Sequence, residues 1–176
     1  SLTTPASWDG TAHASTSTRT AGFLSYPSSL LPVTGTIMAW IYRCGNTGIG
    51  QEVVRASGLV AGHIILRLSS GNGGDDVASA FWGAQQINGT SVPLNSWQHI
   101  AMTFDGSTLS LYQNGILTNS GAASGFSGMP ATFAVGANTT DTLHMNGLVD
   151  DLVILDRAAT AGEILSIYAS RAPVFA

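Results

Sequence analysis

The stretch that decides the fold reads NSWQHIAMTFDGSTLSLYQNGIL and runs from Asn95 to Leu117. Its first half alternates between two kinds of side chain, so that Ile100, Met102 and Phe104 form an apolar stripe on one face of an extended chain. A period of two is typical of a β-strand that buries one face. The pattern therefore predicts a strand from Trp97 to Phe104, packed against a core.

Two turn signals divide this stretch into strands. Asp105-Gly106 follows the first alternating run, and Asn114-Gly115 follows a second, shorter one. Glycine accepts the positive φ angle that tight hairpin turns require, and Asn-Gly is the strongest short hairpin signal. The stretch therefore predicts three consecutive antiparallel strands.

Alternating or β-branched runs predict further strands along the chain, with polar and glycine-containing turns between them. These runs are 11–21 as an edge strand or arm, 36–43, 51–55, 63–68, 77–82, 132–136 and 147–155. Asn88-Gly89 predicts one more hairpin, and the small polar run 118–128 predicts a loop. Run 36–43 is apolar on both faces, which places it near the middle of its sheet.

A single helix is expected near the C-terminus. Thr160 and Glu163 have capping-box spacing, in which the two side chains satisfy free backbone amides at a helix start. Ile164, Ile167 and Tyr168 then share one helical face, so the helix is expected to lie on the sandwich and to close one end of it.

The motif W-x-H-I-A-x-T-x-D-G-x-x-L-x-L-Y-x-N-G, from Trp97 to Gly115, resembles laminin-G-like domains of the concanavalin A-like lectin and glucanase superfamily. The resemblance recurs in family order at Trp8–Gly10, Thr36–Tyr42 and Asn146–Ile154. It implies one domain over 1–176. The expected fold class is all-β: a two-sheet antiparallel β-sandwich, a concanavalin A-like jelly roll of about 12 strands with one short C-terminal helix.

Composition excludes several classes of function. The net charge is −4, the six cationic residues are all arginine, and none of them form a basic run, so nucleic-acid binding is not expected. Cys44 is the only cysteine, which leaves no intrachain disulfide and no zinc cluster. No run approaches the roughly 18 apolar residues of a membrane span. Only 9% of residues are charged, which favours a surface partly covered by a partner.

Catalysis is not expected from this sequence. Glycoside hydrolysis needs two carboxylates across one sugar bond, and the glucanase branch carries them in an E-x-D-x-x-E run that is absent here. The only two glutamates are Glu52 and Glu163, and the second is explained as a helix cap. The protein is therefore predicted not to be an enzyme.

A calcium site is implied by the resemblance, because relatives often bind calcium at a sheet edge with strand-end aspartates. The matching residues are Asp9 and Asp150. Alternation places Asp150 on the face of Leu148, Leu152 and Ile154, so its carboxylate is expected to point inward and to need a cation or hydrogen-bond donors. The alternative is that Asp150 accepts backbone amides without metal.

A ligand site is a second hypothesis. Asn72, Asp75 and Asp76 lie in the most polar loop and could contact a cation or a glycan, or form a plain solvated hairpin. Trp82 could stack on a sugar ring at a sheet rim, or it could belong to the core. The aromatic and imidazole side chains of Trp97 and His99 are expected to pack rather than to bind.

Val153 and Leu155 make the outer face of the last strand apolar, where many relatives carry charged residues. Such a face is covered either by the C-terminal tail, 171–176, or by a protein partner. These two residues are therefore candidates for a protein interface.

Two functions follow from these features. The first is a non-catalytic recognition module that binds a glycan or cell surface through rim loops, with calcium as a possible cofactor. The second is a structural subunit of a larger particle, such as a phage virion decoration, head-fibre or tail protein, that forms a homo-oligomer or binds a virion partner. Both imply an extracellular or virion-surface location.

Overall fold

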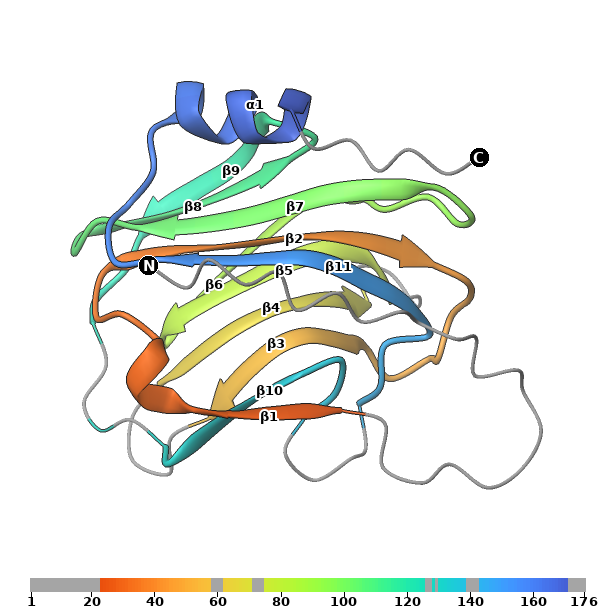
Figure 1. Ribbon diagram of the computed structural model, residues 1–176, viewed down its shortest axis with the longest axis horizontal. Helices are drawn as coiled ribbons and strands as arrows, with labels where there is room; N and C mark the ends of the chain where they lie inside the picture. The colour runs from red at the N-terminus through yellow and green to blue at the C-terminus, as the bar shows by residue number, and fades with distance from the viewer. Residues whose placement is uncertain are drawn as a thin grey trace.

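The computed structural model describes residues 23–57, 62–70, 75–125, 128, 130–138 and 143–170. Two antiparallel sheets are stacked face to face, and a single α-helix lies over the outer side of one of them (Figure 1). The predicted β-sandwich with one C-terminal helix is confirmed, with 11 strands among the described residues. The predicted strand at 11–21 lies outside them.

The six-stranded sheet has the order β1-β10-β3-β4-β5-β6. Its strands are β1 (Leu24–Pro27), β3 (Gln51–Ser57), β4 (His63–Ser70), β5 (Asp75–Gly83), β6 (Gln85–Ser91) and β10 (Thr132–Val135). A one-turn 3-10 helix, η1 (Ser28–Leu30), follows β1.

The five-stranded sheet has the order β11-β2-β7-β8-β9. Its strands are β2 (Gly35–Arg43), β7 (Trp97–Phe104), β8 (Thr108–Gln113), β9 (Ile116–Ala122) and β11 (Gly147–Leu155). The helix α1 (Ala161–Ser170) ends the described chain.

The stretch from Asn95 to Leu117 forms the hairpins that its sequence predicts. β7 pairs with β8 and β8 with β9, all antiparallel. Gly106 turns with a φ of 107°, while Asn114 and Gly115 have φ angles of 52° and 79°. Two consecutive positive φ angles are what a tight two-residue hairpin needs, and they explain the choice of Asn-Gly.

The main core fills the space between the two sheets. Alternation in β2 turns Ile37, Ala39 and Ile41 into this core, where each is 0% exposed. Thr36, Met38 and Trp40 are buried on the opposite face of the sheet, which accounts for the burial of β2 on both faces. β2 lies between β11 and β7, so its predicted central position is confirmed.

Two local predictions are wrong. Asn88-Gly89 does not form a hairpin but lies inside β6, and the turn from β5 to β6 is made at Gly83, whose φ is 65°. Residues 118–122 are not a loop but belong to β9, an edge strand whose side chains are mostly exposed. An edge strand with solvent on both faces needs no apolar alternation, so its sequence looks like a loop.

A β-bulge interrupts β11. Asp150 pairs with Trp40 and Val153 pairs with Met38, so two residues of β11 stand opposite Ala39 alone. Asp151 takes a φ of 47°, a left-handed conformation that aspartate tolerates. The extra residue reverses the alternation along the strand.

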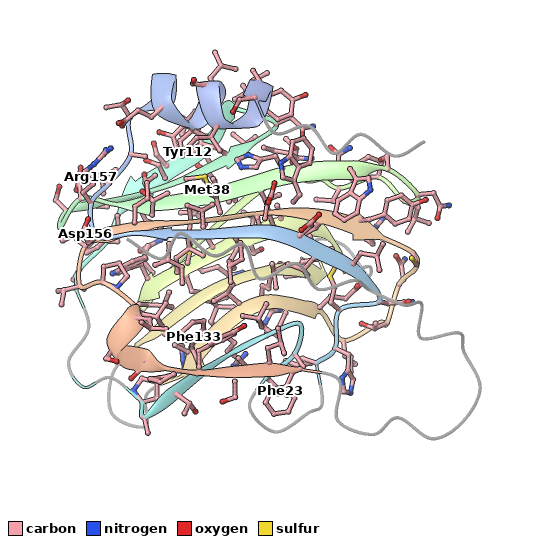
Figure 2. The ribbon with its side chains drawn as sticks, in the orientation of Figure 1. Phe23, Met38, Tyr112, Phe133, Asp156 and Arg157 are labelled. Atoms are coloured by element: carbon pink, nitrogen blue, oxygen red, sulfur yellow. The ribbon has the colours of Figure 1, made fainter. Side chains whose placement is uncertain are left out.

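A second, smaller core joins the five-stranded sheet to α1. Met38, Ala101 and Tyr112 of the sheet are buried with Ala159 and Ile164. Figure 2 shows Met38 and Tyr112 at the level of this sheet beneath α1, and Phe133 at the level of the six-stranded sheet. The helix lies on the sandwich as predicted, but it covers the outer face of the five-stranded sheet and does not close one end (Figure 1).

The capping box that starts α1 forms as its spacing predicts. The Glu163 amide donates to Thr160 Oγ1 over 3.3 Å, and the Thr160 amide donates to Glu163 Oε2 over 2.8 Å.

Among the described residues, no helix could span a bilayer.

Candidate functional site

The two outer faces of the sandwich differ in what covers them. The outer face of the five-stranded sheet lies under α1 and is called the capped face; it is defined by Met38, Trp40, His99, Ala101 and Tyr112. The outer face of the six-stranded sheet lies on the far side of the sandwich from α1 (Figure 1). This second face carries a set of charged, hydroxyl and amide side chains across neighbouring strands.

Strand register brings these side chains together. Leu66 and Leu68 of β4 point into the main core, so alternation turns Arg67 outward, opposite Glu52 of β3 and Ser79 of β5. The resulting set of outward side chains, called the polar strip, runs from β3 to β6 and comprises Glu52, Arg55, His63, Arg67, Ser69, Ser79, Phe81, Gln86 and Asn88.

Glu52 lies at the centre of one half of the polar strip. The residue is 0% exposed, although it stands on an outer face. Arg55 Nη1 donates a hydrogen bond to Glu52 Oε1 over 2.7 Å, and Arg67 Nη1 lies 3.6 Å from the same oxygen. The side chains of the two arginines are 20% and 21% exposed. One buried carboxylate therefore holds two guanidinium groups that solvent can still reach.

Burial shifts both titratable groups of this cluster toward their neutral forms. It raises the pKa of the Glu52 carboxyl, and the charges of Arg55 and Arg67 offset only part of that rise. Burial, together with the charge of Arg55, lowers the pKa of His63, which is therefore mostly neutral at pH 7. Among the described residues, two guanidinium charges stand beside one carboxylate at this cluster.

The other half of the polar strip consists of hydroxyl and amide groups. Ser79 donates from Oγ to Asn88 Oδ1 over 2.5 Å, and Gln86 Nε2 donates to the same oxygen over 3.0 Å. Ser69 and Ser79 also form a hydrogen bond between their hydroxyls. Ser69 and Ser79 are buried, while Gln86 and Asn88 are exposed. Buried hydroxyls thus orient amides that can reach a ligand.

Phe81 supplies the aromatic group of the strip. The guanidinium carbon of Arg67 lies 5.6 Å from the centre of the Phe81 ring, within the range of a cation-π contact. The ring is half-buried. Charged donors, amides and an aromatic edge are the kinds of group that a sugar-binding surface uses.

A second aromatic group lies at one end of the five-stranded sheet. The rings of Tyr42 and Trp97 are both half-buried, with centroids 5.6 Å apart and planes inclined by 57°. Next to them His99 is 1% exposed, and its ring contacts Trp40 and Tyr168. Packing is therefore the role of His99, as expected, while the Tyr42–Trp97 pair is an alternative stacking surface.

Trp82 does not lie at a sheet rim. It is 0% exposed, and its ring stacks on Phe104 in the main core with centroids 5.1 Å apart. A ring without solvent access cannot stack on a sugar, so its prediction as a ligand contact is wrong. Of the other predicted ligand residues, Asn72 lies outside the described residues, and only the backbone of Asp75 and Asp76, at the start of β5, is described.

The predicted orientation of Asp150 is wrong because of the bulge. Val149, Leu152 and Ile154 contact the main core, whereas Asp150 pairs with Trp40 and shares its outward side. Its Oδ1 accepts the Asp151 amide over 2.7 Å, which is a hydrogen bond to backbone of the kind that the metal-free alternative requires.

The described residues do not by themselves form a calcium site. No three of their His, Cys, Asp and Glu side chains come together. Asp9, the proposed partner of Asp150, lies outside the described range, so the calcium site stays a prediction.

Val153 and Leu155 face the direction that their sequence predicts, but the element that covers them is α1. Both are half-buried and pack on the cluster that contains Ile164 and Ala159. Part of this apolar surface is therefore covered within the chain, and a protein interface at these two residues stays a prediction.

Sequence reasoning missed the polar strip. Glu52 stood out only as one of two glutamates, and Arg55 and Arg67 carried no motif. Their outward positions in β3 and β4 follow from alternation, but the pairing of Glu52 with Arg67 requires the strand register.

The motifs and the sandwich agree with a comparison against protein families. Residues 11–165 match the model of the concanavalin A-like lectin/glucanases superfamily, Laminin_G_3. The chain belongs to this superfamily. No curated protein matches it at a significant level.

Several solved structures share the fold of this superfamily member at low sequence identity. Domain 4 of the extracellular arabinanase AbnA from Geobacillus stearothermophilus, solved with arabinotriose, has a TM-score of 0.64 and 21% identity, over 78% of this chain and 68% of that one. A heptameric SAP-like pentraxin from Limulus polyphemus has a TM-score of 0.59 and 15% identity, over 78% and 71%. The sialidase of Trypanosoma rangeli has a TM-score of 0.66 and 14% identity, over 86% of this chain and 26% of that one. These similarities show the fold.

Proposed function

We propose that this chain is a non-catalytic glycan-binding module that holds its ligand on the polar strip. The observation that carries the proposal is the strip itself, in which half-buried arginines, a phenylalanine and exposed amides run across four strands of one sheet face. A likeness to an arabinanase domain that was solved with arabinotriose supports a sugar as the ligand class. An extracellular location accords with this class of ligand.

Glycoside hydrolysis is not part of the proposal. A glycosidase places two carboxyl groups about 5 to 10 Å apart, one on each side of the scissile bond. Glu52 is the only described carboxylate of the polar strip, and Arg55 and Arg67 both contact it. A carboxylate held by two arginines orients them and is poorly placed to protonate a leaving group. We expect no release of reducing sugar from any glycan that binds.

A glycan array with neutral and acidic glycans tests the proposed function. Binding of at least one glycan is expected, and Asn88→Ala and Phe81→Ala are expected to weaken it about tenfold or more, because each removes a contact group of the strip. Tyr42→Ala is the matched aromatic control on the other sheet and is expected to leave binding unchanged. Loss of binding in the Tyr42 variant alone would move the site to the Tyr42–Trp97 pair, and no binding to any glycan would refute the function.

The predicted role of the rim loops and of calcium is retained as a finer proposal. Loop residues 71–74 and 139–142 lie outside the described range. If calcium joins Asp9 to Asp150, EDTA is expected to lower the melting temperature, since a ligand that binds only the folded state stabilises it. Asp150→Asn is expected to remove that difference. An unchanged melting temperature would leave Asp150 with its backbone hydrogen bond alone.

A second candidate function is that of a structural subunit in a larger particle. One observation favours it: Ile116 and Leu117 of edge strand β9 are 67% and 50% exposed, and Leu165 of α1 is 50% exposed. Leu165 packs close to Gly115, so these side chains lie at the junction of β9 and α1. Exposed apolar groups beside an unpaired strand edge are typical of a protein contact.

Light scattering distinguishes this second function. A particle subunit is expected to self-associate at micromolar concentration, and Leu117→Ser with Leu165→Ser is expected to return it to a monomer. A monomer at all concentrations would remove the support for assembly through copies of this chain. Glycan binding on the six-stranded sheet is expected to be the same in this double variant as in the wild-type protein.

A further inference from the structure

Several buried polar atoms of the polar strip have no hydrogen-bond partner. Glu52 Oε2, His63 Nδ1 and Arg67 Nε are each inaccessible to solvent and make no hydrogen bond within the described part of the chain. Buried polar groups in native proteins are almost always paired, and an unpaired ionised group is the most costly kind. Three such atoms in one cluster show that the described residues leave part of its hydrogen-bonding capacity unused.

The guanidinium of Arg67 is the group with the most unused hydrogen-bonding capacity. Its distance of 3.6 Å from Glu52 Oε1 is an ion-pair distance, too long for a hydrogen bond, and no other described residue accepts from it. The N–H donors on its two Nη atoms are therefore available to an acceptor, apart from the electrostatic contact of Nη1 with Glu52. A side chain that is only 21% exposed and makes no hydrogen bond is poised for an acceptor.

The position of this guanidinium is fixed on two sides. Phe81 lies 5.6 Å away on one side, and a Cβ on Gly50 would come within 3.3 Å of Nη2 on another. Gly50 has a φ of 90°, so both its backbone angle and its missing side chain keep this space for the arginine. A rigid, planar group with free donors matches the two oxygens of a carboxylate.

The distribution of charged residues also favours an anionic ligand. The whole chain has a net charge of −4 and only six cationic residues, yet two of these, Arg55 and Arg67, converge on one carboxylate. Two arginines that lie close together favour an anion locally even on a protein of negative net charge. The capped face offers a contrast: its unpaired buried atoms, Trp40 Nε1 and His99 Nδ1, belong to neutral groups.

We infer, granting the proposed glycan-binding function, that the ligand is an acidic glycan whose sugar carboxylate is bound by the guanidinium of Arg67 with Arg55 beside it. Uronic and sialic acids share this chemistry, since both present a carboxylate on a ring that also carries hydroxyls.

Two matched pairs of probes test the inference. Oligogalacturonate is compared with its methyl ester, and 3′-sialyllactose with lactose, by isothermal titration at 50 mM and 500 mM NaCl. In at least one pair the acidic member is expected to bind tenfold or more tightly than its neutral partner. The high salt concentration is expected to reduce that preference, because screening weakens the ion pair.

Variants assign the preference to a residue. Arg67→Gln is expected to lower binding of the acidic probe to the level of its neutral partner. Arg157→Gln is the matched control, since it removes an equal charge from an arginine that pairs with Glu163 at the start of α1. The control is expected to leave the preference intact. The salt comparison on the wild-type protein decides the matter if Arg67→Gln does not fold.

The outcomes separate the inference from the function on which it depends. Equal binding of acidic and neutral partners, with loss of both in Phe81→Ala, would overturn the acidic ligand and keep the glycan site. An acidic preference that survives Arg67→Gln in a folded protein would also overturn it. No binding by any probe, together with a blank glycan array, would overturn both.

Discussion

On the capped face His99 lies beneath α1, against the rings of Trp40 and Tyr168; on the polar strip Glu52 lies between Arg55 and Arg67. Burial favours the neutral form of both groups, lowering the pKa of His99 to about 4 and raising that of Glu52. The neighbours differ: His99 has aromatic rings around it, and Glu52 has cations. The first face is covered by the chain's own helix, whereas on the second Arg67 makes no hydrogen bond to a described residue.

Ile164→Ala is expected to have the largest effect, and to separate the two faces. Ile164 is 0% exposed in the smaller core, so its truncation is expected to reduce the free energy of unfolding by about 3 kcal/mol. Urea titration measures the loss. Glycan affinity of the folded fraction is expected to be unchanged, because the polar strip belongs to the other sheet.

Leu165→Ala is the control for this variant, since Leu165 is the next residue of α1 and is 50% exposed. Its loss of stability is expected to stay below about 1 kcal/mol. If Ile164→Ala weakens glycan binding while the protein is still folded, the two faces are coupled and the contrast between them fails.

The pH dependence of stability tests the capped face next. The pKa of His99 is lowered by burial to about 4, against an ordinary value of 6.5. As the pH falls, the imidazole is therefore protonated at a higher pH in the unfolded chain than in the folded protein. Stability from this residue is present above pH 6.5 and is lost as the pH falls toward 4, by about 3 kcal/mol at most. His99→Phe keeps a ring against Trp40 and is expected to flatten this part of the profile.

Denaturant unfolding at pH 7.5, 6, 5 and 4 gives the comparison. Other groups also lose stability in acid, so the measured quantity is the difference in slope between the wild-type protein and His99→Phe. Parallel profiles would show that His99 titrates normally and is not sealed by α1.

Much of the fold could be predicted from the sequence because a strand that buries one face has apolar residues at every second position. The hairpins at Gly106 and Gly115 and the capping box at Thr160 and Glu163 depend on local chemistry that a short window contains. Strand β2 is buried along most of its length, and its apolar residues on both faces predict a place inside the sheet.

The failures occur where local pattern does not determine the answer. Alternation through Asp150 assumes a regular strand, but the left-handed Asp151 inserts a residue and reverses the faces. The Asn88-Gly89 pair predicts a hairpin turn, but Asn88 lies inside β6, where its side-chain oxygen accepts hydrogen bonds from Ser79 and Gln86. Strand β9 is exposed along most of its length, so its sequence lacks the alternation of apolar and polar residues by which a strand is recognised.

The candidate site was the least predictable part. A charged residue that faces outward reads as ordinary surface, and only register shows that Glu52 meets Arg67 and is buried there. Trp82 illustrates the opposite error, because an aromatic residue in a strand fits a sugar platform and a core equally well until its exposure is known.

Glu52→Gln sharpens the comparison on the polar strip. The substitution keeps the shape and removes the carboxylate charge beside Arg55 and Arg67, so acidic glycans are expected to bind up to about tenfold more tightly and neutral ones unchanged. In the wild-type protein the same gain is expected as the pH falls through the raised pKa of Glu52, which neutralises the carboxylate. Protonation of His63 below its lowered pKa adds charge of the same sign at more acidic pH.

Glu163→Gln is the control, because it is the same substitution at the only other glutamate of the chain. Titration with the acidic probe at pH 7 and pH 5 is expected to show a pH-dependent affinity in the wild-type protein and in this control, and a weaker dependence in Glu52→Gln. Weaker binding by Glu52→Gln at both pH values would mean that Glu52 accepts from the ligand or orients Arg67 more than it opposes the anion.

Thr160→Ala is expected to have the smallest effect and to test how far the capped face depends on the start of its helix. The Thr160 hydroxyl accepts the Glu163 amide over 3.3 Å, and its loss leaves that amide without a side-chain acceptor, at a cost of about 1 kcal/mol. Thr160→Ser keeps the hydroxyl and is expected to retain most of the stability in urea titration. Equal losses in the two variants would assign the effect to the methyl group and leave the cap without a measurable role. Because the helix covers only the five-stranded sheet, neither variant is expected to alter glycan affinity, and a change in affinity would show that the start of α1 communicates with the polar strip.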